Sequence, residues 1–128
     1  MPIRFAILKP YHLIYMQVEG ENSLQEFIQL RVAIADDPDF NPSLVQLVDL
    51  RNANPTKLSI ADFRLMANSI LFQSKARSAI IAPTDLQFAR AQVYRGFVES
   101  LGRNVQVFHS MEEACEWLGV PVEALPGE

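Results

Sequence analysis

The side chains of this 128-residue chain that could take part in chemistry are concentrated where a short apolar run ends. Asp49 lies near the end of the run from Leu44 to Leu50, and Arg51 follows the run directly. In α/β proteins the carboxyl ends of parallel strands face the crevice in which ligands bind, so Asp49 and Arg51 could contact a ligand there. The structural alternative is that Asp49 accepts hydrogen bonds from loop amides or pairs with an arginine.

Two arginines interrupt apolar helical faces. At about 100° per residue, Arg31 projects among Leu24, Phe27, Ile28, Ile34 and Ala35, and Arg90 among Leu86, Val93, Tyr94 and Phe97. Such an arginine must extend to solvent, find a partner or bind an anion. Arg90 falls early in the helix after the fourth predicted strand, near the sheet edge that carries Asp49. We therefore name Asp49, Arg51 and Arg90 as candidate ligand-binding residues, with a structural contact of Arg90 as the alternative.

Residue sets for catalysis or metal binding are missing from the sequence. His12 and His109 have no Cys or acidic residue at metal-ligand spacing, and a zinc site needs three or four ligands. There is no Gly-x-Ser-x-Gly elbow and no glycine-rich phosphate loop. The one cysteine, Cys115, falls on an apolar helical face and is expected to be buried. We expect no catalytic residue, no metal, no cofactor and no enzymatic activity.

Hydropathy periodicity and capping residues predict the elements that position these side chains. The predicted strands are residues 3–9, 12–18, 44–50, 79–82 and 105–108, and the predicted helices are residues 24–35, 60–72, 85–101 and 111–118. The predicted N-caps are Ser23, Ser59, Thr84 and Ser110, with capping boxes to Glu26 and Glu113 for the first and last. Gly20 is expected to end the second strand, and Gly102 and Gly119 to end helices.

The resulting order is ββαβαβαβα. The first two strands are expected to form an antiparallel hairpin, and the alternation that follows implies parallel pairing with right-handed crossovers. The fold class is therefore α/β, a five-stranded mixed sheet covered by four helices. Residues 1–120 form one predicted domain, and residues 121–128 form a Pro- and Gly-rich tail.

Three segments carry a family resemblance. They are residues 37–42 (Asp-Pro-Asp-Phe-Asn-Pro), residues 48–51 (Val-Asp-Leu-Arg), and residues 105–118, in which Val-Gln-Val-Phe leads into Met-Glu-Glu-Ala-Cys-Glu-Trp-Leu. In this order the chain resembles the SpoIIAA-like family of bacterial proteins, also described as STAS/Sec14-like. The resemblance implies a SpoIIAA-like fold. It also implies a protein that could carry a small amphipathic or lipid-like ligand.

The same resemblance implies a candidate modification site. The sporulation anti-anti-sigma factors of this fold carry a phosphorylatable serine at the start of the helix after the Asp-Leu strand end, and here that residue is Ser59. A phosphate there would meet a helix N-terminus, which favours anions. The surrounding residues, Lys57-Leu-Ser-Ile-Ala-Asp62, differ from the usual apolar-Asp-Ser-Ser-Gly pattern. Plain N-capping is the alternative role of Ser59.

Some apolar side chains fall on predicted solvent faces. In the helix after Ser59 the expected buried residues are Ile60, Phe63, Met66, Ala67, Ile70 and Leu71. Leu65 and Phe72 project the other way, and Phe88 on the next helix is similarly placed. We interpret Leu65, Phe72 and Phe88 as an interface, most simply that of a two-fold homodimer. An apolar ligand groove between these two helices is the competing interpretation.

Composition narrows the function classes. The net charge of −4 and the scattered basic residues argue against nucleic-acid binding. The N-terminus has no signal-peptide pattern, and no apolar stretch reaches the roughly 20 residues of a membrane span. We expect a cytoplasmic bacterial protein that acts as a non-enzymatic interaction or regulatory module. Binding or sensing of a small amphipathic ligand is the alternative function.

Overall fold

The computed structural model describes residues 3–54, 57–68 and 76–126. The strands are β1 (Ile3–Leu8), β2 (Leu13–Glu21), β3 (Val45–Asn54), β4 (Arg77–Ile81) and β5 (Asn104–Phe108). The α-helices are α1 (Leu24–Ala35), α2 (Ile60–Asn68), α3 (Asp85–Glu99) and α4 (Met111–Leu118), with short 3-10 turns η1 (Lys9–Tyr11) and η3 (Val122–Ala124). This order of strands and α-helices confirms the predicted one.

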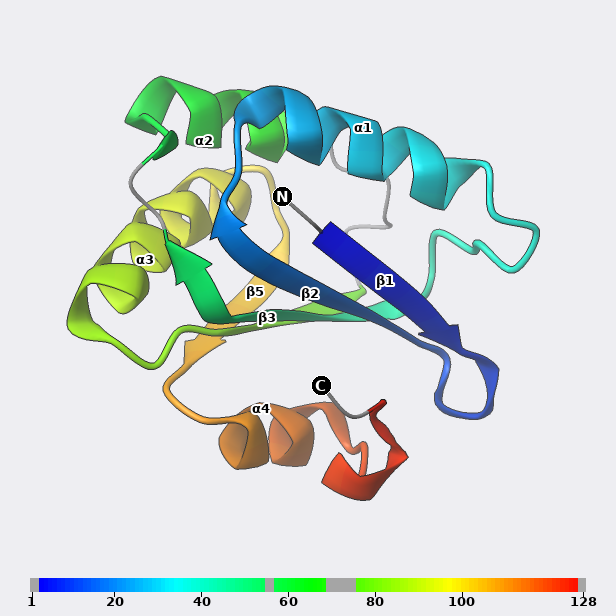
Figure 1. Cartoon of the computed structure of the whole chain (residues 1–128). Coiled ribbons are helices and arrows are strands. Elements are labelled where there is room, and N and C mark those ends of the chain that lie inside the picture. Colours follow the sequence, from blue (N-terminus) through cyan, green and yellow to red (C-terminus); the bar gives the residue numbers. More distant parts are fainter. Residues whose placement is uncertain (1–2, 55–56, 69–75, 127–128) are drawn as a thin grey trace.

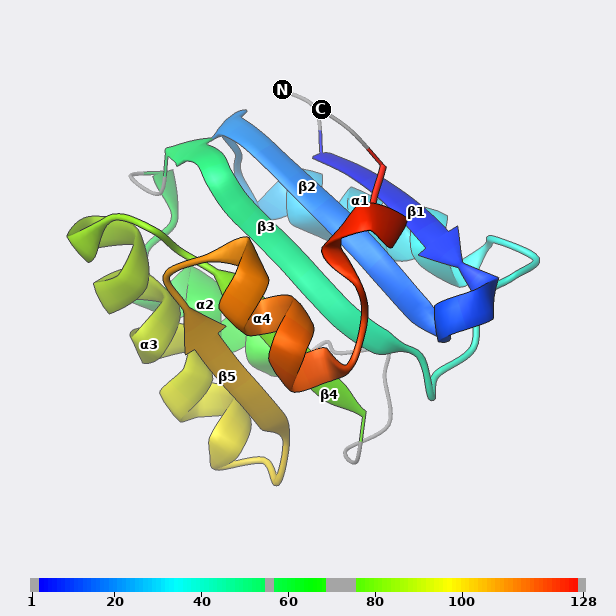
Figure 2. The same ribbon diagram turned by 90° about the horizontal axis from the view of Figure 1, so that it is seen from below.

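The five strands form one sheet in which their order in space equals their order in sequence. β1 and β2 pair antiparallel, and the remaining neighbours pair parallel, as predicted. Each parallel crossover moves one strand along in the same direction, so crossovers of one hand bring their helices to one face. Accordingly α1, α2 and α3 cover one face of the sheet, and α4 lies against the other (Figure 1, Figure 2). No described helix is long and apolar enough to cross a membrane.

Alternation along the strands gives each face its own core. Under α4, strand residues such as Tyr15 and Leu47 pack with the helix residues Ala114, Cys115 and Leu118. The burial of Cys115 confirms its predicted place on the apolar face of the last helix. On the other face, two clusters join the sheet to α1 and to α3.

Hydrogen bonds at the helix starts follow the predicted caps with one exception. Ser23 with Glu26 forms the predicted capping box, and Thr84 and Gln87 form another. Ser110 accepts from the amide of Glu113 at 3.2 Å, but the Glu113 carboxylate accepts from the Ser110 hydroxyl at 3.1 Å, not from its amide. The prediction of a complete box at Ser110 was therefore wrong. This cap uses a hydroxyl–carboxylate bond in its place.

Several predicted boundaries were also wrong. β2 passes through Gly20, and β3 extends to Asn54 across residues predicted as loop. β2 and β3 stay paired past the point where β4 ends, as in the pair Gly20↔Ala53. Backbone pairing between these two strands, and not an apolar pattern, makes the polar residues there part of a strand. α3 ends at Glu99 and not at Leu101. α2 is described through Asn68, so the predicted continuation to residue 72 lies outside the described residues.

Candidate functional site

Asp49 is a buried carboxylate on the α4 side of the sheet. It lies on β3, and the residue is 5% exposed. Tyr15 of the neighbouring strand β2 pairs in register with Leu47, which places the tyrosine beside Asp49 on the same face. The Tyr15 hydroxyl donates to Asp49 Oδ2 at 2.6 Å. A buried phenol and a buried carboxylate therefore satisfy each other.

Arg51 completes this cluster. Side chains two positions apart on a strand point to the same face, so the Arg51 guanidinium can reach the Asp49 carboxylate. Nη2 donates to Oδ2 at 2.8 Å, Nε to Oδ1 at 3.0 Å, and the backbone amide of Arg51 to Oδ1 at 3.0 Å. Asp49 thus pairs with an arginine, as the structural alternative predicted, but the backbone amide it binds belongs to strand β3 and not to a loop.

The protonation states follow from these contacts. Burial alone would raise the pKa of Asp49, but the hydrogen bonds from Arg51 and Tyr15 outweigh burial and hold that pKa below its ordinary value. Burial, followed by the neighbouring Asp49 carboxylate, raises the pKa of Tyr15. Tyr15 is therefore a neutral donor to an ionised acid.

Arg90 lies on the opposite face of the sheet from Asp49 and Arg51. α3 packs over the β3 residues Val48 and Leu50, whose side chains point away from Asp49. The expectation that Asp49, Arg51 and Arg90 form one site is therefore not met, because shared strand ends do not imply a shared face. Arg90 instead lines a cavity.

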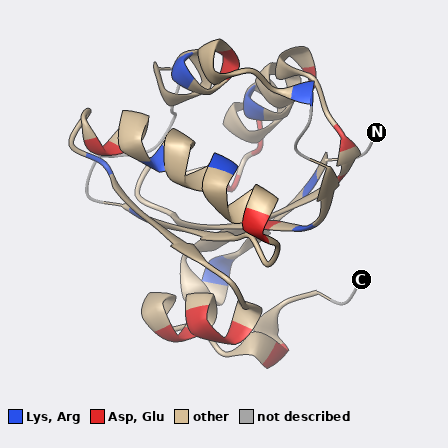
Figure 3. Ribbon diagram, turned by 90° about the vertical axis from the view of Figure 1, so that its left-hand side faces the viewer, with Lys and Arg blue, Asp and Glu red and all other residues tan. Residues whose placement is uncertain are grey.

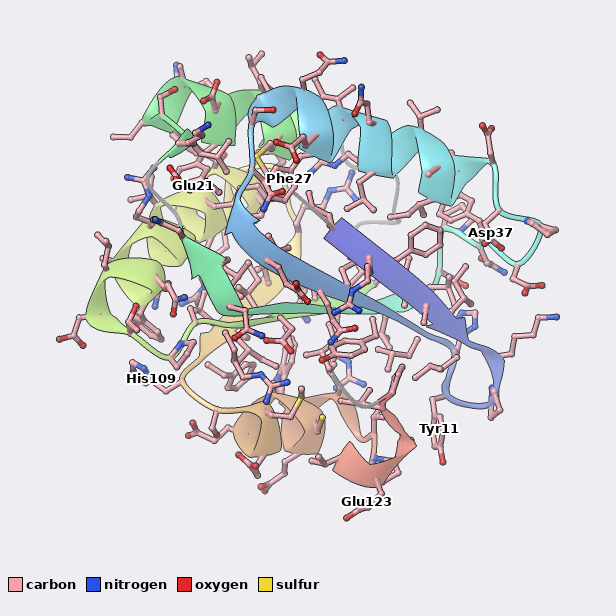
Figure 4. All side chains as sticks on the ribbon, viewed as in Figure 1. Tyr11, Glu21, Phe27, Asp37, His109 and Glu123 are labelled. Carbon is pink, nitrogen blue, oxygen red and sulfur yellow. The ribbon has the colours of Figure 1, made fainter. Side chains whose placement is uncertain are left out.

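The cavity lies between the sheet and helices α1, α2 and α3, and its volume is about 150 Å³. Its apolar lining comes from all three helices and from the sheet. The residues of this part of the lining are Met16, Val18, Phe27, Leu30, Ile34, Val48, Leu50, Leu58, Phe63, Met66, Ile80 and Ala91. Figure 4 labels Phe27, which lies between α1 and the sheet. Such a mostly apolar enclosure with a few polar groups is the usual form of a small-molecule site.

Two guanidinium groups reach this cavity. Arg31 of α1 donates from Nη1 to the carbonyl oxygen of Met66 at 2.6 Å. Arg90 of α3 donates from Nη2 to the carbonyl oxygen of Leu58, and its guanidinium carbon lies 5.1 Å from the centroid of the Phe63 ring. The Arg90 Nε–H is buried and has no hydrogen-bond acceptor. The predicted carbonyl contact of Arg90 is therefore present, and it leaves one donor unused.

The other polar residues of the lining were not predicted from the sequence, and they are Asn22, Gln46, Asn54, Ser78, Gln87 and Tyr94. Gln87 Nε2 donates to the carbonyl oxygens of Leu50 and Ala53 at 2.7 and 2.9 Å, which ties α3 to the end of β3. Burial raises the pKa of the Tyr94 hydroxyl, although the Arg31 guanidinium opposes this. The spacing of Tyr94, four residues after Arg90 on one helical face, was the signal available in the sequence.

Leu65 is exposed on α2 and Ser59 caps that helix, as predicted, whereas Phe88 does not lie alone on the surface. The Ser59 hydroxyl accepts from the amide of Asp62 at 3.1 Å, so it caps α2. Leu65 is 56% exposed. Phe88 of α3 packs against the cluster between α3 and the sheet and stacks on His109 with ring centroids 4.1 Å apart. Figure 4 labels His109, which lies beside α3. Phe72, the third predicted interface residue, lies outside the described residues.

The histidines are far apart in the fold. His12 contacts the Ser43 hydroxyl at 2.6 Å beside the β1–β2 hairpin, and His109 follows β5. Among the described residues no group of three or more His, Cys, Asp or Glu side chains could hold a metal ion.

Comparisons with known proteins bear on the fold. No protein-family model matches the chain. No curated protein matches it significantly. One similar solved structure is the crystal structure of an uncharacterized DUF3478-family protein with a SpoIIAA-like fold from Shewanella loihica PV-4. Its TM-score is 0.60 at 19% sequence identity, and the match covers 91% of this chain and 92% of that one. By this similarity and by its sheet topology, the chain has a SpoIIAA-like fold.

Proposed function

We propose that this protein binds a small, mostly apolar molecule in the cavity beneath α1, α2 and α3. The observation that carries the proposal is the cavity itself, a space of about 150 Å³ with an apolar lining and a few convergent polar groups. A cavity of this volume in another protein admits benzene, so a ligand body of about six carbon atoms fits. Binding or sensing such a ligand is the corresponding function.

Small residues in the lining leave this space open. They are Gly20, Ala53, Ser78 and Ala91. When no ligand is bound, the apolar part of the lining is not covered by protein, at a cost of roughly 25 cal/mol per Å² of apolar surface. A molecule that fills the cavity recovers part of this free energy, and it stabilises the folded state in proportion to its occupancy.

Filling the cavity tests the proposal. Ala91 of α3 lines the cavity and is buried, whereas Ala89 on the same helix is exposed. We expect small aromatic and six-carbon probes to raise the melting temperature of the wild-type protein and of Ala89→Leu, but not of Ala91→Leu. Circular dichroism checks that both variants fold, and Ala91→Val is the smaller filling variant if leucine prevents folding. The proposal fails if no probe stabilises the wild-type protein, or if Ala91→Leu responds as the wild type does.

A second candidate function, association through α2, rests on a separate observation. Leu65 is 56% and Ile60 59% exposed on this helix, so α2 presents apolar surface to solvent. We propose a homodimeric interaction or regulatory module of the bacterial cytoplasm, in line with the family resemblance. Leu65→Lys should weaken self-association measured by sedimentation. Val122→Lys, at an exposed apolar residue of η3, is the control. An unchanged solution mass for Leu65→Lys would exclude this interface.

A further inference from the structure

We infer that the ligand of the cavity carries a single carboxylate and that Arg90 holds this group. The inference rests on the proposed small-molecule function and adds the chemical class of the ligand. Its basis is the charge of the cavity lining, the contacts of Arg90 and the direction of the three surrounding helices.

The cavity lining is cationic in an acidic protein. The chain has 15 Asp and Glu against 11 Lys and Arg, a net charge of −4. The described cavity lining nevertheless contains Arg31 and Arg90 and no Asp or Glu. Buried ions in proteins are ordinarily paired, because desolvation of a charge without a counterion costs several kcal/mol. The chain therefore brings positive charge to this cavity without supplying a carboxylate in its lining.

Arg90 is the arginine with an open donor. Its contacts are the carbonyl oxygen of Leu58 and the face of Phe63, both of which are uncharged. Its Nε–H is buried and lacks an acceptor, which leaves a hydrogen bond to a charged group unmade. Arg90 lines the cavity, so a ligand carboxylate beside its guanidinium would supply the missing counterion.

Helix dipoles add positive potential at the same end of the cavity. The lining residues Asn22, Leu58 and Gln87 lie next to or within the first turns of α1, α2 and α3 respectively. All three helices therefore begin at the sheet edge where the parallel strands end, which Figure 1 shows for α1, α2 and α3. Their N-terminal dipoles favour an anion there, and Glu26, Asp62 and Asp85 in the three first turns use part of this effect from outside the cavity lining. Because Arg90 donates to Leu58, its guanidinium lies at this end.

Arg31 serves a different purpose. It lies in the second half of α1, donates to the carbonyl oxygen of Met66 of α2, and interacts with the Tyr94 hydroxyl of α3. The chain itself therefore supplies polar partners for this guanidinium. The carboxylate is therefore assigned to Arg90, and the apolar body of the ligand extends over Val48 and Ile80 of the sheet.

Asn22 limits the head group further. It is 4% exposed, its Nδ2 donates to the carbonyl oxygen of Glu19 at 2.9 Å, and its Oδ1 has no donor. An acceptor oxygen at this end of the lining disfavours a second negative charge. The lining thus suits a monocarboxylate with a body of about six carbons better than a dicarboxylate or a phosphate ester.

Matched acid and amide probes test the inference. Benzoate and benzamide share one shape and differ in charge, as do hexanoate and hexanamide. For the wild-type protein we expect calorimetric titration to show each acid binding about tenfold more tightly than its amide, as a charge-assisted hydrogen bond would give. Arg90→Met should abolish this preference and retain amide binding. Arg31→Met is the control and should keep the preference.

The outcomes separate the two proposals. If amide and acid bind the wild-type protein equally, the carboxylate assignment is overturned and the small-molecule function stands. If Arg31→Met loses the acid preference and Arg90→Met keeps it, the assignment of the anchor to Arg90 is overturned. If no probe of either kind binds, the proposed function itself fails. Should Arg90→Met not fold, the wild-type comparison of acid with amide still decides the ligand class.

Discussion

Asp49→Asn tests the account of the buried cluster under α4. The substitution keeps the size and shape of the side chain but removes its charge. In the wild-type protein the carboxylate accepts from the Tyr15 hydroxyl at 2.6 Å and from Arg51 Nη2 at 2.8 Å. An asparagine amide group in that place has one accepting oxygen, and its NH2 group must face a donor. The variant therefore loses an ion pair and places two donors against each other.

The expected cost follows from burial. Removal of one partner from a fully buried pair costs about 3–5 kcal/mol. Asp49 is buried, but the Arg51 side chain is 35% exposed, so water can solvate the guanidinium that is left behind. We therefore expect a loss of about 2 kcal/mol at pH 7, which for a domain of this size lowers the melting temperature by about 8 °C. Urea unfolding at pH 7 measures the loss directly.

The pH dependence of this loss identifies its cause. The folded-state pKa of Asp49 lies below its ordinary value, so the carboxylate contributes stability above the unfolded-state pKa of about 4. That contribution disappears as the pH falls through the lowered folded-state pKa. The gap in stability between wild type and Asp49→Asn should therefore narrow below about pH 4. Asp39→Asn, at an exposed carboxylate 2.8 Å from Lys9, is the control and should cost less than about 1 kcal/mol. An equal gap at pH 3 and pH 7 would refute the ion-pair explanation.

Two other substitutions follow from single contacts. Tyr15→Phe removes one hydrogen bond to a charged acceptor and should cost about 2 kcal/mol in urea unfolding, and a neutral effect would mean that Asp49 does not need the phenol. Gly119→Ala should cost about 1 kcal/mol in thermal unfolding because Gly119 has φ +75°, where a Cβ is strained, and a gain in stability would contradict that conformation.

The sequence predicts the fold well because its signals are local and repeated. Alternating strands, capping serines and glycine stops each specify an element, and the order of elements then restricts the topology. The boundary errors occur where tertiary pairing extends a strand, as in the polar end of β3. Ile60 was expected to be buried but is exposed. A helical projection shows on which side of the helix a side chain lies, but it does not show whether another element covers that side chain.

The site was harder to predict because its residues belong to different elements. Arg31 and Arg90 were recognisable as charges within apolar faces, and both do line the cavity. The cavity itself depends on how closely three helices approach the sheet and on small residues such as Ser78 and Ala91. Neither distance nor void volume has a sequence signature. Asn22 and Gln87 were not recognised as candidate site residues, since their tertiary contacts are not visible from the sequence.

The two faces of the sheet account for the different interpretations of Asp49 and Arg90. Under α4 the chain supplies both members of an ion pair, so the charge of Arg51 is neutralised within the fold. α4 itself carries only acidic charged residues, and the arginines Arg31 and Arg90 belong to the helices on the opposite face of the sheet (Figure 3). On that face, the described lining of the cavity contains two guanidinium groups and no carboxylate. A cation that is paired with a carboxylate of the same fold needs no anion from outside, whereas one without a counterion is most stable when a ligand provides the anion. This difference is why Arg51 is assigned to stability and Arg90 to binding.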